Sequence, residues 1–450
     1  MLLNPITVEL VGMARREVTP GTRMRAAMPL LDWLGCAVYG LRYLHGKALL
    51  NYLKEVPEGK GSALGADRKH FENAAFHNAC LGNIAAFDDF DRTSGISPGA
   101  VVIPVALSVA EHIGATGPQL LDAIVRGYEV MLRIGQYLGP KHSVFFDNTS
   151  SAGPFGAAAA AADLLGLSDE QFVWALGNAG TRTGGLKQMQ NEPCMSKSLH
   201  NGFAAQNGLT AALLAKRNFT GPKHILEGPQ GLFPAIARDG SPIEIIYDSD
   251  GTFKILEVSF RPWPANRHTH AAIDATLKAK AALTPGSQLS AIACETYHDA
   301  IKLANQPEPK SEAEAKLSLQ HAVAVAFCKN KPALEDFSPP FDQTRIAAAR
   351  ALVTLKENEA MTRAFPKQYG ARVTLTTTAG ESVTETVSSA WGDPAAALNM
   401  QELETKFQGL LTKVGVLPSL QTELATCVKQ LPEAKSLTDF SKRLQRIQAA

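Results

Sequence analysis

The chain has 450 residues, of which 45% are hydrophobic and 19% are charged, so it is long enough for two or three domains and can bury a sizeable core. Its formal net charge of +1 gives no global attraction to nucleic acid or to an anionic membrane, and we predict neither partner. Any anionic ligand must therefore be held by local arginines and lysines.

The six cysteines are scattered along the chain, and no two of them form a Cys-x-x-Cys pair. This usage is typical of free thiols in a reducing compartment. The N-terminus has no basic segment followed by an apolar run, and no stretch approaches the roughly 18 apolar residues of a membrane span. We therefore expect a cytoplasmic protein.

The first 240 residues predict helices and little sheet. The spacing of apolar residues and the flanking turn signals indicate helices at 5–18, 22–39, 47–54, 69–87, 101–114 and 118–138. The six alanines that begin at Ala157 predict a tightly packed, buried helix to Leu165, with Gly166 as its stop. The Ser-Asp-Glu-Gln sequence at 168–171 resembles a capping box that opens the next helix.

The pattern changes after residue 240. Alternating residues predict short strands or extended segments at 242–247 and 253–260, and clearer strands at 288–297, 370–378 and 382–387. Helices are expected at 311–328, at 343–356 and from residue 395 onward. The predicted fold class is therefore mainly α, with a large all-helical domain (1–264 and 391–450) interrupted by a smaller α+β domain (265–390).

A loop that turns into a helix at 194–208 carries the strongest chemical signal. Ser196 is a reasonable N-cap, because its hydroxyl can accept a hydrogen bond from an early helical N–H group. Lys197 would then lie in the first turn, where the helix dipole disfavours the protonated amine and so favours its use as a base. An exposed lysine at a frayed helix start is the alternative that the local residues leave open.

Three aspartates, Asp88, Asp89 and Asp91, are expected near the C-terminus of the helix at 69–87, where the helix dipole prefers cations. A chain tolerates such a cluster for a partner cation, a metal or a catalytic role, although Arg92 and solvent could also neutralise it. Magnesium uses carboxylate ligands of this kind. Because no second acidic cluster stands out, we predict no metal site.

The segment 259–270 contains two arginines and two histidines and is made rigid by two prolines. Guanidinium groups bind carboxylates in a bidentate manner, so Arg261 and Arg267 suit carboxylate binding. His268 and His270 lack a third close ligand, and zinc is not expected. A domain-junction loop with surface charges is the alternative. The sequence has no P-loop, no Gly-x-Gly-x-x-Gly after a strand and no Gly-x-Ser-x-Gly, so nucleotide binding and serine-hydrolase chemistry have no support.

Five motifs, in order along nearly the whole chain, resemble the MmgE/PrpD family. They start at Asp89 (Asp-Phe-Asp-Arg-Thr, followed by Ser-Pro-Gly), Lys197 (Lys-Ser-Leu-His-Asn-Gly), Leu226 (Leu-Glu-Gly-Pro-Gln-Gly), Arg261 (Arg-Pro-Trp-Pro-Ala) and Glu312 (Glu-Ala-Glu-Ala-Lys-Leu-Ser-Leu-Gln). The family includes 2-methylcitrate dehydratase, cis-aconitate decarboxylase and iminodisuccinate epimerase. The resemblance implies a helical domain built from both ends of the chain, an α+β lid domain with the active site between the two, a homodimer, and neither cofactor nor metal.

The resemblance also implies small di- or tricarboxylate substrates and proton transfer at a carbon beside a carboxylate. Asp89 and Thr93 match the family's Asp and Thr, and Lys197 and His200 match its Lys-x-x-His. Four positions depart from the pattern. Ser97 and Asp147 stand where histidines are common, Arg261 stands at a frequent lysine, and His321 stands at a frequent tyrosine.

We predict a cofactor-independent lyase, of the dehydratase or decarboxylase type, that acts on a small di- or tricarboxylic acid. Lys197 is the expected base, aided by His321 or Asp147, while Asp89 and His200 position the substrate or the lysine. The expected substrate-binding residues are Thr93, Arg92, Ser97, Arg261 and Arg267. An epimerase or isomerase of a dicarboxylate is the alternative in the same fold, and a non-catalytic carboxylate-binding homologue is the alternative of another class.

Overall fold

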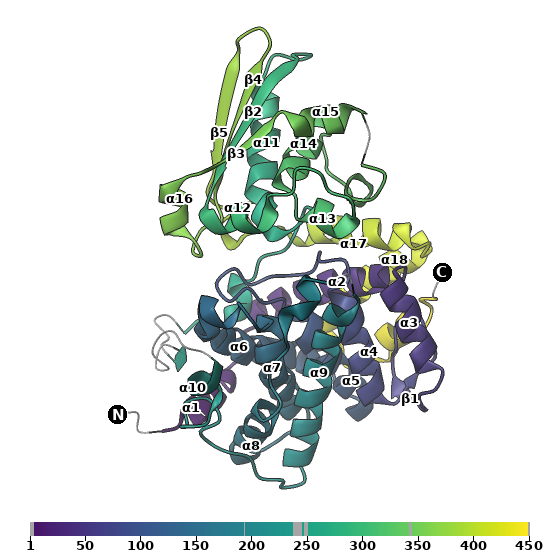
Figure 1. Ribbon diagram of the computed structural model, residues 1–450. Helices are drawn as coiled ribbons and strands as arrows, with labels where there is room; N and C mark the ends of the chain where they lie inside the picture. Colours follow the sequence, from purple (N-terminus) through teal and green to yellow (C-terminus); the bar gives the residue numbers. More distant parts are fainter. Residues whose placement is uncertain (1–3, 193, 237–244, 247–250, 342–343, 449–450) are drawn as a thin grey trace. The chain divides into compact units, whose positions relative to one another are not determined.

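The computed structural model describes residues 4–192, 194–236, 245–246, 251–341 and 344–448 (Figure 1). The chain divides into two compact units, which are described separately below. Unit 1 comprises Met1–Val258 and Asn399–Ala450, and unit 2 comprises Ser259–Leu398. Helices dominate the described residues and the sheet is small, which confirms the predicted fold class, mainly α.

Unit 1 is helical, and its only strand segment among the described residues, β1 (Glu58–Gly61), forms isolated bridges to Lys69. Its helices are α1 (Ile6–Ala14), α2 (Pro20–Gly40), α3 (Leu44–Leu53), α4 (Phe71–Gly82), α5 (Gly99–Ile113), α6 (Gly117–His142), α7 (Asn148–Leu164), α8 (Asp169–Gly180), α9 (Ser196–Ala215), α10 (Leu232–Ile236), α17 (Met400–Lys413), α18 (Pro418–Gln430) and α19 (Thr438–Leu444).

Helix α7 lies at the centre of unit 1. It packs against α5, α6, α8 and α9, and Figure 1 shows it running beside α9. The run Ala157–Ala162 is fully buried, as predicted, because side chains no larger than a methyl group let the neighbouring helices approach. The stop at Gly166, which has a positive φ of 65°, and the capping box of Ser168 and Gln171 at the start of α8 are also confirmed.

The C-terminal segment Asn399–Ala450 completes unit 1, because α17 packs along α2. The Lys406 ammonium of α17 donates hydrogen bonds to Asp32 Oδ1 at 2.6 Å and to the carbonyl of Phe87 at 2.5 Å. No helix in the described part of the chain combines the length and the apolarity that crossing a bilayer requires.

Unit 2 is an α+β unit built on a four-stranded sheet of order β3-β2-β4-β5. Strands β2 and β3 are parallel, and the other two pairs are antiparallel. The strands are β2 (Leu289–Thr296), β3 (Val353–Glu357), β4 (Ala371–Thr377) and β5 (Ser382–Val387), and the helices are α11 (His270–Ala282), α12 (His298–Ala304), α13 (Glu312–Lys316), α14 (Leu319–Cys328), α15 (Thr344–Ala351) and α16 (Glu359–Ala364). Alternate residues of β4 are buried, and α11 packs against β4 and β5.

Several predicted elements differ in the structure. The helix predicted at 311–328 is divided into α13 and α14, because Ser318 is the N-cap of α14 and starts a new helix. The helix predicted at 343–356 is only α15, which ends at Ala351, and the residues from Val353 onward pair with β2 as strand β3. The extended segment predicted at 253–260 contains a 3-10 helix, Lys254–Glu257, anchored by the backbone N–H of Lys254 on Glu129 Oε2 at 2.7 Å. Short apolar runs do not distinguish these conformations. The segment predicted at 242–247 lies largely outside the described residues.

Candidate active site

The three aspartates do not lie at the end of a helix, so the prediction based on the helix dipole is wrong. Helix α4 ends at Gly82, and the aspartates follow in the loop that leads to α5. Asn83 donates to Asp88 Oδ1 at 2.6 Å, and Asp32, which faces the same cluster, is paired with a lysine of α17. Hydrogen bonds inside the unit therefore stabilise this acidic loop. Among the described residues, no three His, Cys, Asp or Glu side chains converge as the ligands of a metal ion.

Asp89 is 1% exposed, and both of its oxygens accept hydrogen bonds. The Tyr128 hydroxyl donates to Oδ2 at 2.7 Å, and the backbone N–H of Gly99, the first residue of α5, donates to Oδ1 at 3.1 Å. Burial, together with the nearby charge of Asp88, raises the pKa of Asp89 to about 8, although the Tyr128 hydrogen bond opposes the shift. The carboxyl group is therefore largely neutral at pH 7.

Thr93 lies in a tight turn that follows Asp89 in the chain. Asp91 Oδ2 accepts hydrogen bonds from Thr93 Oγ1 at 2.9 Å and from the backbone N–H of Ser94 at 2.8 Å. Gln136 of α6 donates to Thr93 Oγ1 at 2.8 Å, and Thr93 is exposed. Arg92, within the same turn, is half-buried. The turn is thus held by Asp91 and presents Thr93 at the surface of unit 1.

The same loop is fixed to the start of α7. Asn148 Nδ2 donates to the carbonyl of Ser94 at 2.7 Å, and the backbone N–H of Ser97 donates to Thr149 Oγ1 at 3.2 Å. Asp147 is the N-cap of α7, since its Oδ1 accepts from the backbone N–H of Ser150 at 2.9 Å. The structure therefore brings Thr93, Ser97 and Asp147 together at the N-terminus of α7.

The loop between α8 and α9 pairs with the segment that precedes α7, which ends at Asp147. The backbone N–H of Asp147 donates to the carbonyl of Gly185, and that of Lys187 donates to the carbonyl of Phe145, both at 2.9 Å. The Lys187 ammonium also donates to the carbonyl of Ser143 at 2.7 Å. Burial lowers the pKa of Lys187, Asp147 opposes this shift, and the charge of Lys197 adds to it.

Helix α9 carries Lys197 and His200 on one side, one turn apart. Lys197 lies in the first turn, as predicted, and its side chain is exposed. The N-cap is Met195 and no side chain caps the helix, so the predicted capping role of Ser196 is wrong because Ser196 already has a helical conformation. Burial lowers the pKa of His200, while the charge of Asp147 raises it and that of Lys197 lowers it. The His200 ring interacts with the backbone of Leu186, and its buried Nδ1 has no hydrogen-bond partner.

Three predicted site residues belong to unit 2. Arg267 Nη2 donates to both oxygens of Asp393, at 2.6 and 2.5 Å, while its buried Nη1 has no partner. Arg261 is 7% exposed, and its charge acts together with that of Arg267 on His268, whose pKa falls to about 3 mainly through burial. His321 is buried, with Nε2 on the carbonyl of Asp336 at 2.8 Å and Nδ1 accepting from Arg350 at 3.2 Å.

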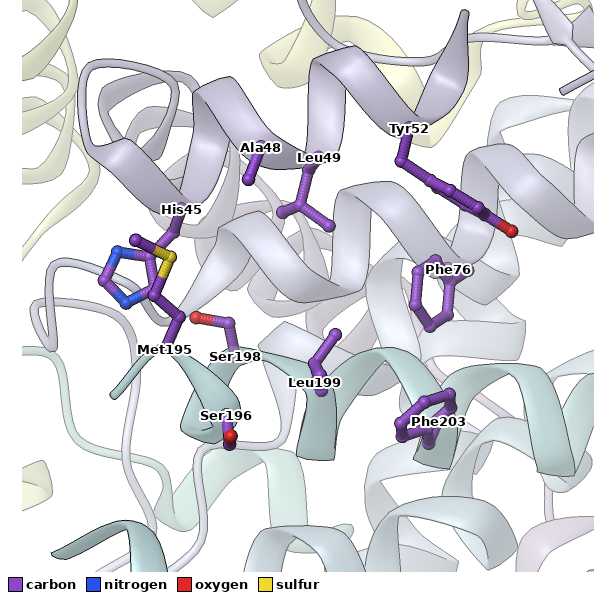
Figure 2. Close-up of a pocket in the computed structure, with 10 residues that line it drawn as sticks. All are labelled: His45, Ala48, Leu49, Tyr52, Phe76, Met195, Ser196, Ser198, Leu199 and Phe203. Atoms are coloured by element: carbon purple, nitrogen blue, oxygen red, sulfur yellow. The ribbon is translucent and has the colours of Figure 1, made fainter. Parts of the chain in front are cut away.

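An apolar groove of about 460 Å³ lies on another side of α9 (Figure 2). In Figure 2, α3 lies on one side with His45, Ala48, Leu49 and Tyr52, Phe76 comes from α4, and Met195, Ser196, Ser198, Leu199 and Phe203 come from the start of α9. Neither Lys197 nor His200 lines it. The groove and the polar candidate site therefore use different sides of the same helix.

Sequence reasoning missed Tyr128, Lys187 and Gly99. Tyr128 lies inside α6, where an isolated tyrosine looks like an ordinary core residue, and nothing around it in the sequence signals its contact with Asp89. Lys187 lies in a loop between two helices without a recognisable motif. Gly99 was part of the Ser-Pro-Gly segment, but its role as a hydrogen-bond donor depends on how the loop folds back.

Comparison with known proteins identifies the same family along the chain. The MmgE/PrpD N-terminal domain matches residues 10–244, and the MmgE/PrpD C-terminal domain matches residues 263–430. Cis-aconitate decarboxylase from Mus musculus is 25% identical, over 99% of this chain and 94% of its own length. The enzyme of that name from Homo sapiens is 27% identical over 76% of this chain and 73% of its own. A cis-aconitate decarboxylase-like protein from Aspergillus oryzae is 30% identical over 50% of this chain and 49% of its own.

Proposed function

Because this chain belongs to the MmgE/PrpD family, we propose that it is a cofactor-independent lyase that acts on a small di- or tricarboxylic acid. The mouse and human relatives are named cis-aconitate decarboxylases, which makes cis-aconitate the first substrate to test. The reaction is either loss of water or loss of carbon dioxide. Both reactions pass through a carbanion beside a carboxylate, so they need the same two things from the protein, a group that moves a proton and cations that stabilise the negative charge.

The arrangement of Lys197 and His200 beside the N-terminus of α7 carries this proposal. In a dehydration, the Lys197 amine takes the proton from the carbon next to the carboxylate. In a decarboxylation, its ammonium form gives a proton to the carbanion that the loss of carbon dioxide leaves. His200 is neutral at pH 7 because burial lowers its pKa, and its unpartnered Nδ1 can accept a hydrogen bond from Lys197 or from the substrate.

Cations and backbone dipoles provide the carboxylate sites in this proposal. The N-terminus of α7 favours anions, and Thr93 and Ser97 lie beside it. Arg92 is the nearest arginine in the sequence of that loop. In unit 2, Arg267 keeps a buried Nη1 without a partner, so the guanidinium retains a donor for a carboxylate in addition to its pair with Asp393.

Asp89, Asp147 and His321 have supporting roles in the proposed mechanism. Asp89 acts as a neutral carboxyl group that positions its neighbours. Asp147 is occupied as the N-cap of α7 and contributes its charge to Lys187 and His200. His321 uses both ring nitrogens within unit 2, so we assign it to maintaining that unit and assign proton transfer to Lys197.

A dicarboxylate epimerase is the second candidate. Ser97 and Asp147 stand where the family commonly has histidines, so two frequent acids or bases are missing, whereas the lysine is retained. A lysine can remove a proton on one side of the carbon, and an epimerase needs only a second group to return it on the other. Exchange of the α-proton with solvent deuterium, without loss of water or carbon dioxide, would identify this reaction.

We also propose that the protein is a cytoplasmic homodimer. The apolar groove continues into exposed side chains on α3 and α9, of which Leu44 is 69% exposed, Tyr52 51% and Phe203 55%. Apolar surface of this kind is stabilised when a partner covers it. A second copy of the chain is the partner that the family resemblance implies.

The decisive experiment compares turnover of a panel of acids by the wild type and two lysine variants. The panel contains cis-aconitate, citrate, methylcitrate and acids derived from aspartate. We expect turnover of at least one acid, and we expect Lys197→Ala to reduce its kcat by about 100-fold or more, since general acid–base groups typically contribute this much. Lys216→Ala is the matched control, because Lys216 is exposed at the other end of the same helix.

The outcomes separate the hypotheses. Unchanged turnover in Lys197→Ala contradicts the assignment of this lysine as the base. If no acid in the panel reacts but one raises the midpoint of thermal unfolding, the non-catalytic carboxylate-binding homologue is favoured. If no acid reacts or binds, the proposed substrate class is wrong.

A further inference from the structure

The loop that leads into α9 places a second lysine at the candidate site. Backbone hydrogen bonds between Asp147 and Gly185 and between Lys187 and Phe145 join this loop to the residues that precede α7. Lys187 begins a short 3-10 helix, Lys187–Gln190, directly after this pairing. Its backbone position is therefore fixed next to the N-cap of α7, where the predicted site residues Ser97 and Asp147 converge.

The ammonium of Lys187 is only partly neutralised there. It donates one hydrogen bond, to the carbonyl of Ser143, so two of its three N–H groups remain for another partner. Asp147 is close enough to interact with it, but that carboxylate already caps α7. Lys197 adds a second positive charge to the group, and His200 is neutral at pH 7. Two ammonium groups against one carboxylate leave an excess positive charge.

The hydrogen bonds that join the two loops do not require a charged side chain at residue 187. Two backbone hydrogen bonds already join the loops, and a neutral side chain could donate to Ser143 as well. Partial burial of an ammonium group costs free energy unless charge or hydrogen bonding compensates it. An anionic ligand that approaches the N-terminus of α7 supplies the missing compensation, and the dipole of α7 acts in the same direction.

We propose that Lys187 is a substrate-binding residue, whose ammonium holds one carboxylate of the acid while Lys197 acts at the neighbouring carbon. This inference rests on the proposed function and extends it, because it requires a substrate with a second carboxylate within reach of the reacting carbon. The preference of the enzyme for di- and tricarboxylates over monocarboxylates then depends on Lys187.

The test uses Lys187→Gln and Lys187→Arg in the full-length protein, with Lys216→Gln as the control. The glutamine amide keeps a donor for the carbonyl of Ser143 but has no charge, whereas arginine keeps both. Calorimetric titration with tricarballylate, a saturated tricarboxylate, measures binding without turnover. We expect Lys187→Gln to raise the dissociation constant about 10-fold or more, Lys187→Arg to restore most of the affinity, and Lys216→Gln to leave it unchanged. With a reacting acid, KM should rise much more than kcat falls.

Acetylation of the wild type provides a second measurement that needs no variant. Saturating tricarballylate should protect Lys187 and Lys197 from acetic anhydride, read by mass spectrometry, and should leave Lys216 as reactive as before. Equal affinity of Lys187→Gln and wild type, or no protection of Lys187 while Lys197 is protected, overturns the inference and leaves the proposed function intact. If tricarballylate and the whole panel of acids fail to bind the wild type, the proposed function itself fails.

Discussion

Asp89 shows how the surroundings of one residue set its chemistry. A carboxylate with two hydrogen-bond donors would normally be ionised, because donors stabilise the negative charge. Here burial and the neighbouring Asp88 outweigh the donors from Tyr128 and Gly99 and raise the pKa of Asp89 to about 8. At neutral pH the group is therefore an acid that can donate a hydrogen bond, and its substitution should alter both stability and activity.

The raised pKa of Asp89 predicts the direction in which stability depends on pH. Between about pH 4, where a free aspartate titrates, and about pH 8, the unfolded chain has lost this proton while the folded chain keeps it. The folded state then binds more protons, so the free energy of unfolding falls as the pH rises. In Asp89→Asn this contribution is absent, and the variant should gain on the order of 1 kcal/mol relative to wild type for each unit of pH between about 5 and 7.

Urea denaturation of both proteins at several values of pH in this window measures that difference. Groups other than Asp89 titrate in both proteins and cancel in the comparison. If the free energy of unfolding depends on pH in the same way in the wild type and in Asp89→Asn, the folded and unfolded states release this proton at the same pH, and the prediction is wrong.

Gly99 predicts a second effect at the residue scale. A Cβ atom at this position would lie 2.7 Å from Asp89 Oδ1 and 2.8 Å from the Tyr128 hydroxyl, closer than such atoms approach. Gly99→Ala should therefore destabilise unit 1 by about 1–3 kcal/mol, the usual cost of overpacking, and displace Asp89. Gly12→Ala, where a Cβ meets nothing within 4 Å, is the control for denaturation. A midpoint for Gly99→Ala equal to that of the control contradicts the close packing.

The sequence identified Asp89 and Lys197 as individual residues but could not predict their partners. Tyr128 reaches Asp89 because α6 packs beside the loop before α5, a contact between residues 39 positions apart. Lys187 reaches Ser143 across 44 positions in the same way. Local patterns reveal residues with unusual chemistry, whereas burial and hydrogen-bond partners, which set a pKa, depend on the packing of distant segments.

At the scale of elements, the N-terminus of α7 organises the candidate site, and Asp147 is its cap. Asp147→Ala should cost about 1 kcal/mol of stability through loss of the cap, whereas Asp147→Asn should cost much less, because asparagine also caps helices well. Both variants remove the charge that acts on Lys187 and His200. Chemical denaturation separates the two variants, and a similar change in kcat or KM in both would assign that change to the charge.

An equal loss of stability in Asp147→Ala and Asp147→Asn would contradict the capping role. Thr116→Ala and Thr116→Asn provide the comparison at another N-cap, since Thr116 caps α6 away from the candidate site. These variants should reproduce the difference in stability and leave turnover unchanged.

Elements with strong local signals were predicted correctly, and the others depended on tertiary context. The capping box at Ser168 and the alanine run of α7 are complete within a few residues of sequence. Strand β3 was missed, because nothing in the sequence near Val353 shows that β2 lies alongside to receive its hydrogen bonds. The end of α4 was placed five residues too late, at Phe87, since the turn after Gly82 contains apolar residues that continue the helical pattern.

At the scale of the whole molecule, the sequence predicts helices after residue 395 but does not indicate which helix they pack against. Helix α17 packs on α2, from the opposite end of the chain, and Lys406 pairs with Asp32 beneath the acidic loop. The C-terminal segment therefore supports the loop that carries Asp89 and Thr93. The residue pattern predicts that both ends of the chain belong to one helical domain, but which helices pair, and through which side chains, is not visible in local periodicity.

The apolar groove of α3 and α9 predicts the oligomeric state. Phe203 is 55% exposed at its rim and contacts the ring of Phe76 with centroids 5.6 Å apart, so a partner chain that covers the groove would bury both rings. The wild type should have twice the 48.1 kDa mass of the chain by sedimentation equilibrium, and Phe203→Glu should shift it toward the monomer, because a buried unpaired carboxylate is strongly unfavourable. Leu303→Glu is the matched control, since Leu303 is 51% exposed in unit 2 and should leave the dimer intact. A monomeric wild type, or a dimer that persists in Phe203→Glu at low micromolar concentration, would show that a second copy does not cover this groove.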